Sequence, residues 1–353
     1  MNQPVPSIAF VIGAGASSEV NMPTGHGLKE TIASALAFEV DDAGRLAGGN
    51  PTLHEAMYQL AQRPGSHGDI NQYLNSARLI QGGMPQAPSI DNFIDSHRAD
   101  PRIAECGKLA IAFQILKAER ASKLFVDPGN IYNRLKFGEI EDTWFNAFFQ
   151  LLALNTQLDD FHERLSRVTV VSFNYDRTLE HFLHQAVQNY YGCSSEEAAK
   201  VLSSLVILHP YGSVGFLPWQ QSNTNAVPYG GELGSSALLS VASTLRTFTE
   251  GTNSKDSQIK DIRASVFDAE AIIFLGFAYH ELNLEVLFGP VSVEPVRHLK
   301  QVYGTAKGLS ESNKNAIALE LGNLGRYEPS QITLRRDLSA AELFPEYSRS
   351  LRF

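Results

Sequence analysis

The chain has 353 residues, 43% of them apolar, and carries a formal net charge of −9 at pH 7. This length predicts one large or two modest domains around a real hydrophobic core. A nucleic-acid-binding surface needs clustered Lys and Arg, so the acidic balance predicts no direct binding to DNA or RNA. Two distant cysteines, Cys106 and Cys193, supply neither a disulfide framework nor a CxxC metal site, which favours a reducing compartment.

No targeting or membrane segment is expected from the sequence. The segment Met1 to Pro6 lacks the basic residues that open a signal peptide, and the apolar run at 8–12 is too short for its core. The run at 271–278 falls far short of a membrane span. We therefore expect a cytoplasmic protein without a membrane contact.

Six short apolar runs bounded by turn residues predict β-strands, with helical patterns between them. The first four are apolar throughout, as in strands that are buried on both faces. Strands that alternate with helices predict an α/β fold, with a Rossmann-like, mostly parallel sheet and helices on both faces. The six predicted strands are 7–12, 168–173, 205–208, 271–275, 300–303 and 331–334.

A long helical insertion separates the first two predicted strands. It is far longer than a simple crossover requires, and the ranges 103–123 and 144–157 have strong helical character. We predict a Rossmann-like domain formed by residues 1–40 and 160–353, and a helical subdomain formed by residues 41–159.

The first predicted strand runs directly into a glycine turn, Gly13-Ala14-Gly15. Glycines at this point let the backbone approach a pyrophosphate, as in dinucleotide-binding folds. The third glycine of the GxGxxG pattern is replaced by Ser18, so a tight strand-to-helix turn without a ligand stays an alternative.

The other strand exits carry polar residues or glycine. Asn174 and Asp176 follow the second strand, and Asp176 alone is also explained as a helix cap. His209 follows the third strand, where it could act as a general base near neutral pH. Gly276 ends the fourth strand and again permits close approach of a ligand, although an ordinary turn explains it equally well.

Taken in order, the four exits GAGAS, SFNYD, LHPYGS and FLGFAYHELN resemble the sirtuin family. More narrowly, they are similar to the sirtuin-like NADase domains of bacterial anti-phage defence systems. The segments Met22-Pro23-Thr24-Gly25 and Ser89-Ile90-Asp91-Asn92-Phe93 resemble further parts of that branch. The resemblance covers 7–38, 168–215 and 270–283, and says little about the insertion or the last sixty residues.

The resemblance implies a set of site residues. Asn174 would be the active-site asparagine and His209 the catalytic histidine. Asp176 would hold the asparagine or the nicotinamide carboxamide. The residues implied for binding NAD are Gly13, Ala14, Gly15, Ala16, Ser17, Thr24, Asp176, Gly212, Ser213, Gly276 and Phe277.

Two departures from the family pattern bear on the activity. Protein-deacylating sirtuins hold zinc with paired CxxC motifs, and two cysteines cannot supply four thiolates, so we expect no metal and disfavour lysine deacylation. The usual His-Gly is interrupted here as His209-Pro210-Tyr211-Gly212, which alters the geometry expected around the histidine.

The function expected is NAD+ hydrolysis at the nicotinamide–ribose bond, giving nicotinamide and ADP-ribose. Asn174 would position the ribose and a water, and His209 would be the base. An unregulated NADase would exhaust its own cell, so we expect an anti-phage effector that a trigger or assembly activates. A homo-oligomer and a DNA-translocating partner ATPase encoded nearby are expected by family analogy. The alternatives are a non-catalytic module that senses NAD or ADP-ribose, a deacylase, and a Rossmann-fold oxidoreductase.

Overall fold

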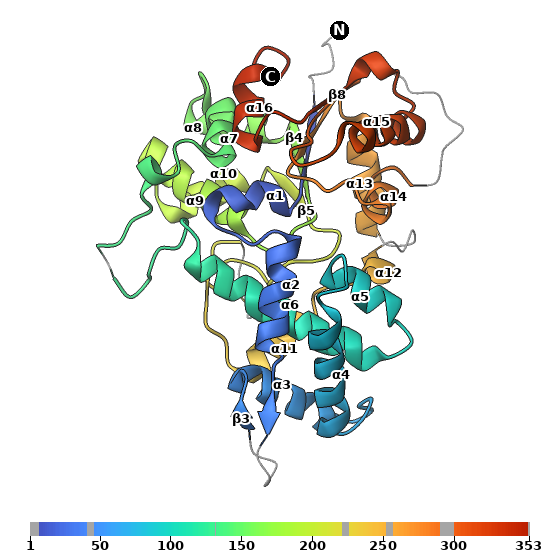
Figure 1. The fold of residues 1–353 in the computed structure, drawn as a ribbon. Coiled ribbons are helices and arrows are strands. Elements are labelled where there is room, and N and C mark those ends of the chain that lie inside the picture. The colour runs from blue at the N-terminus through green and yellow to red at the C-terminus, as the bar shows by residue number, and fades with distance from the viewer. Residues whose placement is uncertain are drawn as a thin grey trace.

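The computed structural model of the chain describes residues 7–40, 46–130, 132–220, 226–251, 257–289 and 300–351. Six strands form one parallel sheet in the order β5-β4-β1-β6-β7-β8 (Figure 1). The strands are β1 (Ile8–Ile12), β4 (Val168–Ser172), β5 (Val206–Leu208), β6 (Ala271–Leu275), β7 (Gln301–Thr305) and β8 (Ile332–Arg335). The predicted α/β class and all six predicted strands are confirmed, with ends that differ by one or two residues.

β1 lies at the centre of the sheet, hydrogen-bonded to β4 on one side and to β6 on the other. Its side chains alternate between the two faces, and all of them are buried. The strand order reverses at β1, because the chain first adds β4 and β5 on one side and then returns to add β6 on the other. In open α/β sheets this reversal leaves a crevice at the carboxyl ends of the strands, where ligands bind.

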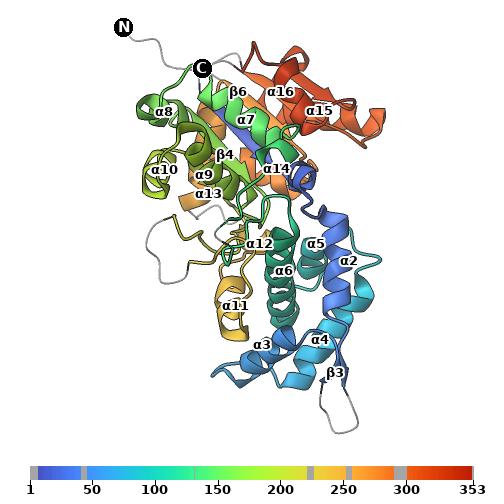
Figure 2. The same cartoon turned by 90° about the vertical axis from the view of Figure 1, so that its left-hand side faces the viewer.

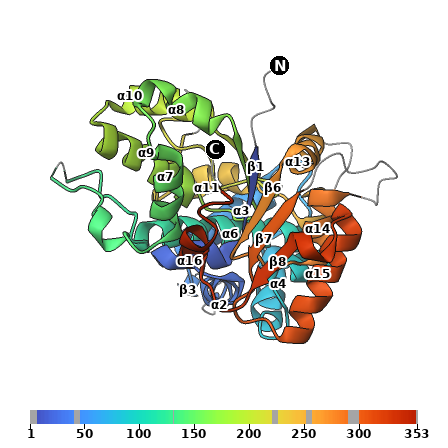
Figure 3. The same cartoon turned by 90° about the horizontal axis from the view of Figure 1, so that it is seen from above.

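Helices cover both faces of the sheet (Figure 3). One face packs against α7 (Trp144–Ala153), α8 (Leu158–Leu165), α9 (Thr178–Tyr191), α10 (Ser195–Leu202) and α16 (Ala340–Glu346). The other face packs against α13 (Ser257–Asp268), α14 (Glu281–Phe288) and α15 (Glu311–Gly325). On the first face Phe10 of β1 meets the ring of Phe148 edge-on, with centroids 4.9 Å apart.

A second group of helices lies beyond the carboxyl edge of the sheet (Figure 2). It comprises α2 (Gly25–Ala35), α3 (Pro51–Gln62), α4 (Ile70–Gly83), α5 (Ile90–Ser96), α6 (Pro101–Ala121) and α11 (Ser235–Ala242). A short antiparallel pair, β2 (Glu39–Val40) and β3 (Leu46–Gly48), follows α2. Short helical turns at α1 (Ala14–Ser17) and α12 (Phe248–Gly251) flank the carboxyl edge.

The packing of these helices bears on the predicted subdomain 41–159, which stays a prediction. α7, which lies inside that range, and α8, which begins at its end, both pack on the face of the sheet. Two helices outside it, α2 and α11, pack on α6. Within the described ranges, no helix combines the length and apolarity that a membrane crossing requires.

Candidate functional site

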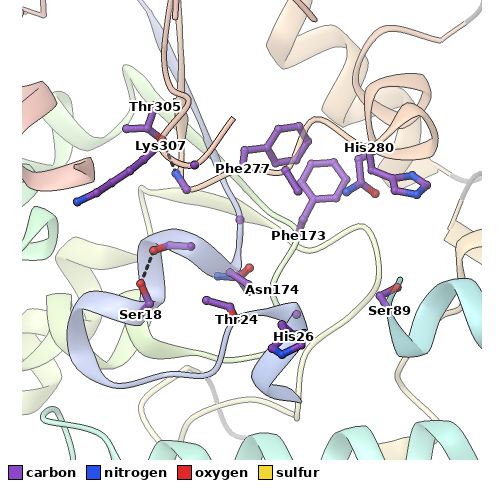
Figure 4. Close-up of a pocket in the computed structure, with 18 of the residues that line it drawn as sticks. Ser18, Thr24, His26, Ser89, Phe173, Asn174, Phe277, His280, Thr305 and Lys307 are labelled. Atoms are coloured by element: carbon purple, nitrogen blue, oxygen red, sulfur yellow. Dashed lines mark hydrogen bonds between the residues drawn. The ribbon is translucent and has the colours of Figure 1, made fainter. Parts of the chain in front are cut away.

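A cavity of about 800 Å³ opens at the carboxyl ends of β1, β4, β6 and β7. Figure 4 shows Asn174 near its middle, with Phe173 and Phe277 beside it. Lys307 and Thr305 lie toward one end, and His280 and Ser89 lie toward the other (Figure 4). The cavity therefore occupies the crevice that the reversal of strand order creates, with α5 closing one end of it.

The glycine turn after β1 forms part of the wall. Gly13 donates its N–H to Leu275 O, and Gly15 donates to Gly276 O, both at 3.0 Å. A Cβ on Gly13 would lie 2.6 Å from Gly276 O, and one on Gly15 would lie 2.8 Å from the same atom. Glycine is required because the exits of β1 and β6 pack backbone against backbone, and the same turn leaves its other side open to the cavity.

Asn174 follows β4 and is 8% exposed. Its Nδ2 donates to Ser17 Oγ at 3.0 Å. The Ser17 hydroxyl in turn lies 3.3 Å from Thr178 Oγ1, and Thr178 donates to Asp176. Within the described residues, Asn174 Oδ1 makes no hydrogen bond, so the acceptor end of the carboxamide is available at the cavity.

Ser17 and Asp176 lie behind Asn174 and do not line the cavity. Ser17 is 1% exposed and Asp176 is 7% exposed. Thr178 is the first residue of α9, and its backbone N–H donates to Asp176 Oδ1 at 3.1 Å. This hydrogen bond stabilises the start of the helix. Burial raises the pKa of Asp176 to about 6, against the opposing effect of the Thr178 hydrogen bonds.

His209 also lies outside the cavity wall. Its Nδ1 lies 3.0 Å from the backbone oxygen of Asn174, and its Nε2 lies 2.8 Å from Glu180 Oε1. The side chain of His209 is 12% exposed and that of Glu180 is 6% exposed. His209 therefore contacts the backbone of Asn174, the predicted active-site asparagine, from the side away from the cavity.

The structure thus divides the predicted site residues into two groups. Those that line the cavity are Gly13, Ala14, Gly15, Thr24, Asn174, Gly276 and Phe277. Those that lie outside its wall are Ala16, Ser17, Asp176, His209, Gly212 and Ser213. Gly212 has a positive φ of 75°, and a Cβ there would lie 2.4 Å from Thr244 O, so a turn accounts for this glycine.

One end of the cavity contains polar residues that the sequence did not single out as site residues. Tyr175 donates its hydroxyl to Asp91 Oδ1 at 2.5 Å, and burial raises the pKa of Asp91 above its usual range. Asn92 Nδ2 lies 3.2 Å from His280 Nε2, and Tyr211 donates to Asn283 Oδ1 at 2.7 Å. Tyr175, Tyr211, His280 and Asn283 belong to the strand exits SFNYD, LHPYGS and FLGFAYHELN, and Asp91 and Asn92 belong to the Ser89–Phe93 segment. The resemblance assigns a role to none of these side chains.

The opposite end carries the exposed cation Lys307, which follows β7. Glu19 also lines this end, but its two carboxylate oxygens accept the backbone N–H groups of Trp144 at 2.7 Å and Ala341 at 3.1 Å. Burial raises the pKa of Glu19, and the backbone hydrogen bonds oppose that rise. No cluster of three or more His, Cys, Asp or Glu placed to hold a metal occurs within the described ranges.

The fold and the site define an α/β protein with a doubly wound parallel sheet and a cavity at its switch point. No protein-family model matches the chain, and no curated protein matches it. Among solved structures it is similar to a Sir2 homolog–NAD complex, at 14% identity and a TM-score of 0.38. The alignment covers 98% of this chain and 88% of the other.

Proposed function

We propose that the chain is an NAD+ hydrolase that cleaves the bond between nicotinamide and ribose. The observation that carries the proposal is the position of Asn174, whose carboxamide lines the switch-point cavity beside the Gly13–Gly15 turn. Asparagine at this exit is also the residue that the sirtuin-like resemblance implies for catalysis. The products are nicotinamide and ADP-ribose.

The cavity wall fits a dinucleotide in its chemistry. Gly13 and Gly15 have no side chains, and a Cβ on either of them would clash with the backbone after β6. The backbone of this turn can therefore approach a pyrophosphate in the cavity directly. Phe173 and Phe277 lie with ring centroids 5.1 Å apart and supply an apolar surface for a planar ring. Gly276 and Thr24, also predicted to contact NAD, belong to the same wall.

The reaction breaks the C1′–N bond of NAD+ and forms a C1′–O bond to water, with loss of one proton from that water. Nicotinamide leaves with the electrons of the broken bond and becomes neutral, so no strong general acid is needed. Positive charge develops on the ribose in the transition state, as in other glycoside hydrolysis. Because Nδ2 of Asn174 is held by Ser17, its Oδ1 is the atom placed to accept from the water or from a ribose hydroxyl.

The biological role follows from the sequence resemblance to anti-phage NADases. We propose an effector that stays inactive until assembly or a trigger activates it, as a homo-oligomer and with a DNA-translocating ATPase as the candidate partner. The reason is physical: free NADase activity would drain the NAD of the producing cell. Size-exclusion chromatography combined with activity measurement tests this, and a strict monomer with full activity would contradict it.

The central experiment incubates the purified protein with NAD+ at several protein concentrations and follows nicotinamide and ADP-ribose by chromatography. We expect equal amounts of the two products, with a specific activity that rises with protein concentration. The N174A variant serves as the inactive control. Release of neither product at any concentration, with or without a neighbour-encoded partner, would reject the proposal.

A second candidate is a non-catalytic module that binds NAD or ADP-ribose. The observation in its favour is that both ring nitrogens of His209 are already occupied, by Asn174 O and Glu180. Titration calorimetry with NAD+ and with ADP-ribose separates the two candidates. Tight binding of both ligands without turnover under any condition favours the sensing module.

A further inference from the structure

Both ring nitrogens of His209 lie within hydrogen-bond distance of an oxygen atom. Nδ1 faces a backbone carbonyl oxygen at 3.0 Å, and Nε2 faces a carboxylate oxygen at 2.8 Å. Neither of these atoms can donate a hydrogen bond when Glu180 is ionised. With Glu180 as a carboxylate, both contacts are hydrogen bonds only when both ring nitrogens carry hydrogen, and His209 is then an imidazolium.

The charges around the ring agree with this assignment. Burial opposes the charged form, but the Glu180 carboxylate and the two hydrogen bonds outweigh it, so the pKa of His209 lies above its usual value. Two carboxyl groups face the ring from the elements around it, Glu180 from α9 and Asp176 from the β4–α9 connection. An imidazolium has no lone pair to offer, so His209 in this state cannot accept a proton from substrate or water.

Asn174 depends on His209 for a backbone partner. Phe173 still donates to Ile12 O of β1 at 2.9 Å, but Asn174 lies beyond the last paired residue of β4. Its own N–H reaches Ser172 Oγ at 3.4 Å, a long contact. The carbonyl oxygen of Asn174 is therefore held outside the sheet ladder, and His209 Nδ1–H is the donor that satisfies it.

We propose that Glu180 and His209 form a buried ion pair that positions Asn174, with Glu180 orienting the imidazolium and the imidazolium fixing the backbone of Asn174. This inference rests on the proposed function for its activity readout. It makes His209 and Glu180 positioning residues, and leaves Asn174 as the one member of the trio that faces the cavity.

The proposal fixes the direction of the pH dependence. When His209 loses a proton, one N–H remains for two acceptors, and the carboxylate is the stronger acceptor. The carbonyl of Asn174 then loses its donor. NAD+ turnover should therefore be full below the pKa of folded His209 and should fall as pH rises through it.

The test is a pair of titrations on the full-length wild-type protein and on E180Q. Long-range nitrogen–proton correlation of labelled histidine reports whether both nitrogens of His209 are protonated. We expect a charged ring at pH 7 in the wild type, and a pKa lower by about one unit or more in E180Q. The alkaline limb of NAD+ turnover should move to lower pH by the same amount.

The control variant is E163Q, which removes an equal charge from an exposed position on α8. E163Q should leave both the His209 titration and the activity limb unchanged. The wild-type titration stands on its own, so the first half of the test does not depend on the folding of E180Q.

Three outcomes would overturn the inference. The first is a neutral His209 at pH 7. The second is an E180Q variant in which His209 titrates with the same pKa as in the wild type. The third is an alkaline limb of NAD+ turnover that stays at the same pH although the pKa of His209 has shifted. If no turnover exists at any pH, the proposed function fails instead, and the side-chain amide signal of Asn174 replaces activity as the readout. That signal must change as His209 titrates for the positioning role to hold.

Discussion

Asn174 donates its carboxamide N–H to the hydroxyl of Ser17 across 3.0 Å, although the two residues are 157 positions apart in the chain. The contact joins the exits of β4 and β1, which are neighbours in the sheet. It fixes which end of the carboxamide faces the cavity, since the nitrogen is held and the oxygen is not. The chemistry proposed for the site depends on that orientation.

Replacing Asn174 by alanine should remove this acceptor. We expect N174A to lower kcat for NAD+ hydrolysis by about a hundredfold or more, the range that loss of a positioned catalytic group costs. Affinity for NAD+ should change much less, because the glycine turn and the aromatic wall remain. The measurement is kcat by product release and Kd by calorimetry. Asn146 on α7 lies outside the cavity lining, so N146A is the matched control and should keep wild-type turnover.

Gly276 lies where the backbone after β6 meets the backbone of the turn after β1. Its φ is +54°, and a Cβ there would lie 1.9 Å from Ala16 N and 2.3 Å from Gly15 C. G276A should therefore lower the free energy of unfolding by at least about 2 kcal/mol, through strain and displacement of the glycine turn. Urea unfolding measures the change, and NAD+ binding should weaken with it.

Gly82 on α4 supplies the control for that variant. A Cβ at Gly82 would meet nothing within 4 Å, and the residue is helical. G82A should leave NAD+ binding intact and raise the free energy of unfolding by up to about 1 kcal/mol, through helix propensity. If G276A unfolds at the same urea concentration as the wild type, the close approach of the β1 and β6 exits is wrong.

Most of the sheet was predictable because its strands are buried on both faces. Short continuous apolar runs such as Ile8–Ile12 are typical of strands that are buried on both faces, and turn residues mark where each strand ends. Helix ends were harder. α7 was predicted to reach Gln157 but ends at Ala153, and Asn155 takes a positive φ of 54° that no glycine signalled.

The site was predictable only to the level of the strand exits. Which side chain at an exit faces the cavity depends on partners from other elements. The ring of His209 lies behind Asn174, where it contacts the carboxyl group of Glu180 on α9. No local sequence signal predicts this contact. Asn92 reaches His280 across 188 positions of sequence, so the polar end of the cavity could not be seen from either segment alone.

Glu119 and Arg177 form a buried ion pair that ties α6 to the start of α9. Their side chains are 0% and 1% exposed, and Arg177 Nη2 lies 2.6 Å from Glu119 Oε2. Glu119 also accepts the backbone N–H groups of Arg177 and Gly230. Removing one partner leaves an uncompensated buried charge, so E119A should lower the free energy of unfolding by about 3–5 kcal/mol.

An exposed ion pair one residue further along the chain gives the comparison. Arg120 and Glu232 lie 3.3 Å apart with 47% and 78% of their side chains exposed. E232A should change the free energy of unfolding by less than about 1 kcal/mol. Denaturant unfolding of both variants at the same pH measures the two effects. Equal losses for E119A and E232A would mean that the buried pair contributes no more than a surface one.

Asp176 makes the stability of the fold depend on pH. Its pKa rises from 3.8 in the unfolded chain to about 6 in the fold, chiefly through burial. A carboxyl group with a raised pKa favours the fold when protonated. Its contribution is therefore full below about pH 4 and is lost as pH rises through about 6. At pH 7 the ionised group costs the fold about 3 kcal/mol relative to its protonated form.

The D176N variant should remove that cost, because its carboxamide is neutral and its oxygen can still accept from Thr178. We expect the free energy of unfolding of D176N, relative to the wild type, to rise by about 2.4 kcal/mol between pH 4 and pH 7.5. Urea unfolding at half-unit steps of pH measures this difference, in which groups common to both proteins largely cancel. A difference that stays flat across that range would show that Asp176 is ionised without penalty, and that its hydrogen bonds to Thr178 outweigh its burial.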